Sequence, residues 1–192
     1  GGGGVGAGWF DIRVAPLLEL WGFGTGDARV PTAEELTIAL QVVDYTRIRL
    51  EREQLQVFLE DDNAKIDLGG IAKGFIVDKA VEVLLAQSVT SAYFDAGGDI
   101  RVIGEKPDGT PWRIGVRHPR ERRKLIARVE LRDQAIVTSG DYERFFMSDG
   151  NRYHHILNPV TGVPAHGLSS VTVVANDAFT ADRKSTRLNS SH

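Results

Sequence analysis

The feature that most constrains the fold is a long series of short β-rich runs, which are separated by residues typical of tight turns. The breaks include Pro107-Asp108-Gly109 and Asp149-Gly150-Asn151, both of which carry turn chemistry. Because consecutive strands joined by short turns pair antiparallel, the series predicts mostly antiparallel sheets. The runs lie at 47–50, 55–59, 92–95, 99–103, 112–117, 125–132, 135–138, 153–157 and 169–175.

Two stretches have helical periodicity instead. Thr32 and Glu35 form a capping-box pattern ahead of apolar residues spaced for one helix face, which predicts a helix over 32–44. A second stretch with a single apolar face begins after two glycines and predicts a helix over 71–87. Together with the strands, these helices predict a mixed α/β or α+β domain.

The charge of the chain argues against nucleic acid as a partner. Its formal net charge is −3, so no overall positive field is available to hold a polyanion. A basic stretch between Trp112 and Arg132 contains a cluster at 120–124, which we interpret as solvated charge in a hairpin loop. No aromatic residues are interleaved with it for base stacking.

Both ends of the chain differ from its interior. Residues 1–7 are glycine-rich and match a dinucleotide fingerprint only formally, since no strand precedes them, so we interpret them as a non-native or disordered start. Residues 183–192 hold one large apolar residue and no acidic one, which is typical of a frayed or foreign, atypical tail. We expect residues 8–182 to form one domain.

The segment from Asp67 to Gly74 has the chemistry of a phosphate-binding loop. Gly69 and Gly70 would let the backbone approach a ligand closely, while the start of the predicted helix and Lys73 would favour an anion. The alternative is a tight turn with a solvated lysine. The acidic glycine segment 95–99 is explained mostly as a turn.

Two further segments carry groups suited to catalysis. His154 and His155 are adjacent in an extended run and point to opposite faces, so at most one of them can act as a base at a given site. Asp182 and Thr186 are four residues apart and would lie on one face of a helix. Their oxygens suit a hard divalent cation such as Mg²⁺.

Taken together and in order, these segments strongly resemble the ApbE family of FAD:protein FMN transferases. The resemblance runs from about Gly8 to Thr186 and depends on six collinear groups of motifs. These are GWFD (8–11) with LWGFG (20–24), DLGGIAKGFIVDKA (67–80), DAGGDIRVIG (95–104) with PWRIGVRHP (111–119), TSGDYER (138–144), HILNPVTGVP (155–164), and SVTVVA (170–175) with TAD (180–182).

The resemblance implies a fold and a role for individual residues. It implies an ApbE-like, T-fold-like α+β domain with mostly antiparallel sheets and two or more helices. Because family members are usually longer at both ends, it also implies that residues 8–182 are an interior fragment of this domain. His155 would be the catalytic base, and Mg²⁺ would be held by the carbonyl of Gly70 with Asp182 and Thr186. The residues expected to contact FAD are Trp9, Phe10 and Asp11 through the backbone, with Asp67, Lys73 and Leu157.

The resemblance also implies the reaction and its partners. FMN would move from FAD to a Thr or Ser hydroxyl of an acceptor protein, with release of AMP, in a Mg²⁺-dependent step. Acceptors in the family are subunits of membrane redox complexes such as the Na⁺-translocating quinone reductase and Rnf. Family members are commonly lipid-anchored in the bacterial periplasm, and a homodimer is compatible with the resemblance. The alternatives are an FAD pyrophosphatase, and a flavin-binding module inactive because of truncation.

Overall fold

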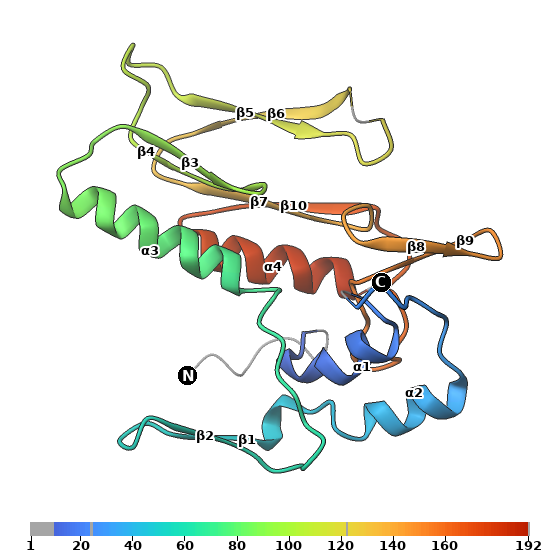
Figure 1. The fold of residues 1–192 in the computed structure, drawn as a ribbon. Coiled ribbons are helices and arrows are strands. Elements are labelled where there is room, and N and C mark those ends of the chain that lie inside the picture. The colour runs from blue at the N-terminus through green and yellow to red at the C-terminus, as the bar shows by residue number, and fades with distance from the viewer. Residues whose placement is uncertain (1–9, 24, 122, 192) are drawn as a thin grey trace. The chain divides into compact units, whose positions relative to one another are not determined.

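The computed structural model describes residues 10–23, 25–121 and 123–191, and the chain forms two compact units. The first unit takes in the chain up to Leu68, the segment Glu143–Gly167 and the residues from Ser190 onward. The second comprises Gly69–Tyr142 and Leu168–Asn189. All strand pairs in the described part are antiparallel and are accompanied by helices (Figure 1), which confirms the α+β class.

The second unit is built on a four-stranded sheet. Its strands run in the order β10 (Ser170–Ala175), β7 (Ala135–Gly140), β4 (Asp99–Ile103) and β3 (Ala92–Ala96). Helices α3 (Ala72–Ala86) and α4 (Ala178–Ser190) lie side by side against one face of this sheet (Figure 1). The hairpin of β5 (Trp112–Arg117) and β6 (Leu125–Leu131) packs on the other face.

The central strand β7 is buried on both faces, and its side chains alternate between the two layers. Ala135 and Val137 pack with Val77 of α3 and with the alanines of α4. Ile136 points the other way and packs against the hairpin with Leu131. Because successive side chains of a strand point to opposite faces, this one apolar strand contributes to both cores.

Helices α3 and α4 approach each other closely at Gly74. A Cβ atom added there would lie 2.4 Å from the carbonyl oxygen of Ala178, so only glycine fits at this position. Asp78, one turn further along α3, accepts hydrogen bonds from the N–H groups of Ala178 and Phe179, both at 2.9 Å. One helix therefore caps the N-terminus of the other.

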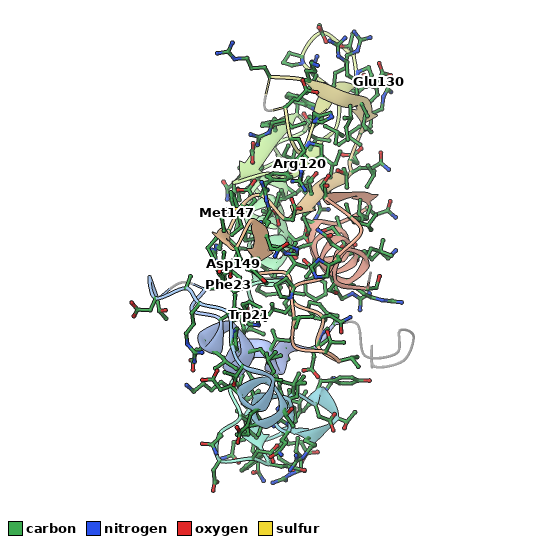
Figure 2. The ribbon with its side chains drawn as sticks, turned by 90° about the vertical axis from the view of Figure 1, so that its right-hand side faces the viewer. Trp21, Phe23, Arg120, Glu130, Met147 and Asp149 are labelled. Carbon is green, nitrogen blue, oxygen red and sulfur yellow. The ribbon has the colours of Figure 1, made fainter. Side chains whose placement is uncertain are left out.

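The first unit is mostly helices, turns and two hairpins. Its core contains Leu17, Trp21 and Leu157, and the indole Nε1 of Trp21 donates to the carbonyl of Gly162 at 2.8 Å. Trp21 stacks on Phe23, with ring centroids 6.2 Å apart (Figure 2). The elements are η1 (Ile12–Val14), α1 (Ala15–Leu20), α2 (Ala33–Leu40), η2 (Tyr45–Arg47), β1 (Ile48–Glu51), β2 (Gln56–Leu59), β8 (Phe145–Ser148) and β9 (Asn151–His154).

The two predicted helices are both present. The helix predicted over 71–87 is α3, almost residue for residue. The helix predicted over 32–44 begins as expected, with both hydrogen bonds of the capping box between Thr32 and Glu35, but α2 ends at Leu40. It stops early because Asp44 caps the next turn, accepting from the N–H of Thr46 at 2.9 Å.

The sequence reasoning missed α1 and β8, and it placed Asp182 and Thr186 on a helix without giving bounds for α4. The tail after Asp182 was expected to be frayed or foreign; it is not frayed, because α4 continues to Ser190, and a foreign origin stays a prediction. This helix lacks the apolar stripe by which helices are usually recognised. Its buried residues are small or polar: Ala178, Ala181, Asp182, Ser185, Asn189 and Ser190.

The basic residues of the loop between β5 and β6 were expected to be solvated, but one of them, Arg120, is paired with a carboxylate. Arg120, labelled in Figure 2, donates to both carboxylate oxygens of Asp141, at 2.6 and 2.5 Å. The same guanidinium also donates to the hydroxyl of Ser169 at 2.9 Å. Arg120 therefore ties the loop to the ends of β7 and β10, because a two-pronged guanidinium–carboxylate pair is a strong, directional contact.

We expect Gly74→Ala to destabilise the protein. Alanine is the better helix former by up to about 1 kcal/mol, but overpacking against the backbone of α4 should cost roughly 1–3 kcal/mol. A lower free energy of unfolding in urea would be the measured result. Gly115→Ala is the matched control, since its Cβ would meet only the movable side chain of Leu125. An equal loss in both variants would contradict the close helix contact.

Candidate active site

The phosphate-loop segment lies at the start of α3, as the sequence indicated. Gly69 and Gly70 directly precede the helix, and Lys73 lies in its first turn. The ammonium Nζ of Lys73 is 2.5 Å from Oδ1 of Asp99, the first residue of β4. Lys73 is half exposed, whereas Asp99 is buried, and burial raises the pKa of its carboxyl while Lys73 opposes that rise.

Asp182 lies on α4 where that helix meets the start of α3. Its side chain is almost fully buried, and Oδ2 accepts a hydrogen bond from the N–H of Gly74 at 3.0 Å. Burial raises the pKa of Asp182 to about 6, and the nearby charge of Asp99 adds to the rise. The Gly74 N–H and the Lys73 ammonium act in the opposite direction. A buried carboxylate of this kind is stabilised by a cation.

Thr186 follows Asp182 by one turn of α4, so the two side chains share a helix face as the spacing predicted. The Thr186 hydroxyl oxygen is 3.2 Å from Oγ of Ser139 on β7, and Ser139 is also 2.8 Å from Oγ of Ser185. Arg183 and Lys184, which lie between Asp182 and Thr186, are exposed. These two charged residues therefore leave the shared face unaltered.

The residues present fit a hard divalent cation. Asp182 supplies a buried carboxylate that lacks a cationic hydrogen-bond partner among the contacts described, Thr186 supplies a hydroxyl, and Gly70 has a backbone carbonyl at the start of α3. Oxygen donors of these kinds are the ligands that Mg²⁺ prefers. The described residues contain no group of three or more His, Cys, Asp or Glu that could hold a metal.

The remaining predicted FAD contacts belong to the first unit. Asp11 accepts from the N–H groups of Arg13 and Tyr45, both at 2.8 Å, so its carboxylate holds the local backbone in place. The N–H of Asp67 donates to the carbonyl of Ile12 at 2.7 Å. Phe10 is partly buried, and the side chain of Leu157 lies in the core. Trp9 lies outside the described residues, and the roles of all these residues toward FAD stay predictions.

The two adjacent histidines have different environments, as their alternation predicted. His154 is buried, and its Nε2 is 2.8 Å from the carbonyl oxygen of Ala165, which is a structural contact. His155 is partly exposed, and its Nδ1 is 3.2 Å from the carbonyl oxygen of Arg144. A carbonyl can only accept, so this contact places the proton of neutral His155 on Nδ1 and the basic lone pair on Nε2.

The structure thus places Lys73 near Asp182 where α3 meets α4 in the second unit, with Thr186 one turn further along α4 and Gly70 just before α3. Sequence reasoning missed two residues of this arrangement, Asp99 and Ser139. The glycines of 95–99 are sufficient to explain a turn, so the acidic residues there gave no separate signal. Burial of Asp99 at a strand start, beside otherwise apolar positions, is the property that distinguishes it from Asp95, which is exposed.

The raised pKa of Asp182 predicts the pH dependence of stability in the metal-free protein. The folded state holds a proton on this group that the unfolded state has already lost, so stability should fall as pH rises from about 4 to about 6. Asp182→Asn should remove that part of the pH dependence, because the amide does not titrate. Urea unfolding at a series of pH values, in a chelator, measures it. If the free energy of unfolding changed equally with pH in the two proteins, the buried environment assigned to Asp182 would be contradicted.

Comparison with known proteins identifies the family. The sequence profile described as "ApbE family" matches residues 5–191. An FAD:protein FMN transferase of Vibrio cholerae is 38% identical over 190 residues, which cover 96% of this chain and 56% of the relative. Another, of Klebsiella pneumoniae, is 36% identical over 175 residues, covering 90% and 54%. The chain spans about half the length of these curated relatives.

Solved structures agree with the sequence relatives. The crystal structure of the ApbE protein of Thermotoga maritima superposes with a TM-score of 0.89 at 46% identity, covering 94% of this chain and 59% of that one. The apo form of the flavinyl transferase ApbE of Pseudomonas stutzeri gives a TM-score of 0.82 at 37% identity, covering 94% and 56%. The fold, the ordered motifs and the family match agree, and the chain belongs to the ApbE family.

Proposed function

We propose that the protein carrying this chain is a Mg²⁺-dependent FAD:protein FMN transferase. The observation that carries the proposal is the arrangement where α3 meets α4: the buried carboxylate of Asp182 accepts from the Gly74 N–H near the Lys73 ammonium, and Thr186 follows one turn along α4. This combination of one mobile cation with hard oxygen donors suits a substrate that contains a pyrophosphate. The names of the curated relatives support the same reaction.

The residues of the second unit would bind and orient the pyrophosphate. The ammonium of Lys73 would contact phosphate oxygens, while the carbonyl of Gly70, Asp182 and Thr186 would hold the cation. When bound, Mg²⁺ supplies Lewis-acid stabilisation of the negative charge that develops on the phosphates. Burial raises the pKa of Asp182 to about 6, and a bound cation would favour the ionised carboxylate that acts as a ligand.

His155 would act as the general base. Its Nε2 would accept the proton of the acceptor Thr or Ser hydroxyl as that oxygen attacks the FMN-side phosphorus. A new phosphorus–oxygen bond forms to the acceptor, the bond to the bridging oxygen breaks, and AMP leaves with the electron pair. The contact of Nδ1 with the Arg144 carbonyl supports this role, because it fixes the tautomer that has its lone pair on Nε2.

A direct assay tests the proposal. The protein is incubated with FAD, Mg²⁺ and an acceptor protein, after which the mass of the acceptor and free AMP are measured. We expect AMP and flavinylated acceptor in equal amounts. AMP without a gain in acceptor mass would instead show an FAD pyrophosphatase. If neither product formed, the protein would be a flavin-binding module without transferase activity. Omission of Mg²⁺ with added chelator should abolish both products.

We predict that His155→Ala lowers the transfer rate by roughly 100-fold or more, because general-base catalysis contributes about 10²–10⁴-fold. FAD affinity, measured by fluorescence titration, should change little, since the proton transfer occurs only in the transition state. His166→Ala is the matched control, because His166 is an exposed loop histidine. Unchanged turnover of the His155 variant would remove this residue from the mechanism.

We also propose the partners and location that the family resemblance implies. The acceptors would be subunits of bacterial membrane redox complexes of the Na⁺-translocating quinone reductase or Rnf type, and the enzyme would act in the periplasm. Among the described residues, no helix is long and apolar enough to cross a membrane. Mass spectrometry of membrane proteins from cells lacking the gene would test the acceptor, because its flavin phosphoester should disappear. Light scattering would test the homodimer.

A further inference from the structure

The ion pair between Lys73 and Asp99 is unusual in how unequally its partners are buried. The side chain of Asp99 is 1% exposed, whereas that of Lys73 is 51% exposed, and Nζ lies 2.5 Å from Oδ1. Asp99 is fixed at the start of β4, inside the sheet. A rigid, buried anion therefore holds the charged end of a long side chain whose stem stays accessible to solvent.

This pair is poorly built as a purely stabilising contact. The second oxygen of Asp99, Oδ2, is buried and has no hydrogen-bond partner among the described residues. By contrast, both oxygens of Asp141 accept from Arg120, and both oxygens of Asp78 accept from backbone N–H groups of α4. Burying a carboxylate that is only half satisfied is unfavourable, so such groups are concentrated where function requires them.

The benefit of the pair lies in what it does to Lys73. A free lysine side chain populates many rotamers, and ordering them on binding an anion weakens the interaction. Contact with Asp99 selects in advance the conformers whose ammonium lies beside the first turn of α3. Two of the three ammonium protons remain able to donate to a ligand, because the contact with Asp99 uses one.

We propose that Asp99 is a positioning residue for Lys73, which it holds ready to contact the pyrophosphate of FAD. The inference rests on the proposed function and adds a residue to it. Asp99 acts through Lys73 and has no direct contact with the substrate. As an anion, Asp99 would repel the phosphates if it faced them alone. Removal of its charge should therefore weaken FAD binding if Asp99 positions Lys73, and strengthen FAD binding if Asp99 only repels the phosphates.

The test measures FAD affinity in the full-length protein with Mg²⁺, by quenching of flavin fluorescence. We expect Asp99→Asn to raise the Kd for FAD about tenfold, the order of magnitude of the rotamer freedom regained by a lysine. Combined with Lys73→Gln, the same substitution should change the Kd by less than about twofold, because the residue through which it acts is gone. Tighter or unchanged binding by Asp99→Asn would overturn the proposal, as would an equal loss in both backgrounds.

Asp95→Asn is the matched control. Asp95 lies in the same turn but is exposed, and its carboxylate accepts from the N–H of Gly98 and the hydroxyl of Tyr93. Its substitution should leave the Kd within about twofold. Circular dichroism checks folding, and Asp99→Ser replaces Asp99→Asn if the amide does not fit. A wild-type protein that fails to bind FAD would overturn the proposed function and this inference together, whereas normal wild-type binding with an unaffected Asp99 variant would overturn the inference alone.

Discussion

The arrangement of the second unit depends on how closely α4 lies against α3. Gly74 removes the side chain that would separate them, and its N–H donates to Asp182 at 3.0 Å. Asp78 caps the start of α4, so the two helices are joined by directional bonds as well as by packing. This contact places an acidic side chain of one helix beside the N-terminal turn of the other, which is where backbone N–H groups favour negative charge.

The sequence predicted those elements whose stability has a local signature. The capping box at Thr32 and Glu35 located the start of α2, and the apolar face of α3 located that helix at both ends. Helix α4 had no such signature, because it is buried through Ala178, Ala181 and Ser185 rather than through large apolar residues. Its stability comes from tertiary contacts across about a hundred residues of sequence, which periodicity does not register.

The residues of the candidate site also differ in whether the local sequence gives a signal for them. The sequence singled out Lys73 from a glycine-rich helix start, and Asp182 and Thr186 from their helical spacing together with the family resemblance, while their roles stay predictions. Asp99 was not singled out, since its segment is explained by a turn and its importance comes from a partner 26 residues away. Ser139 became visible only when β7 was seen to face α4. Residues that act through another residue need the packing before they can be recognised.

The charges of the second unit explain why a cation belongs in the proposed site. Two buried carboxylates, Asp99 and Asp182, face one ammonium, that of Lys73, and the interaction of all three is reflected in the raised pKa of Asp182. With both carboxylates ionised, this group is net negative and would repel a pyrophosphate. A divalent cation bound at the proposed site would reverse that sign, and the buried carboxylate that is unfavourable in the metal-free protein would serve as its ligand. Stability and substrate affinity are therefore expected to depend on the same ion.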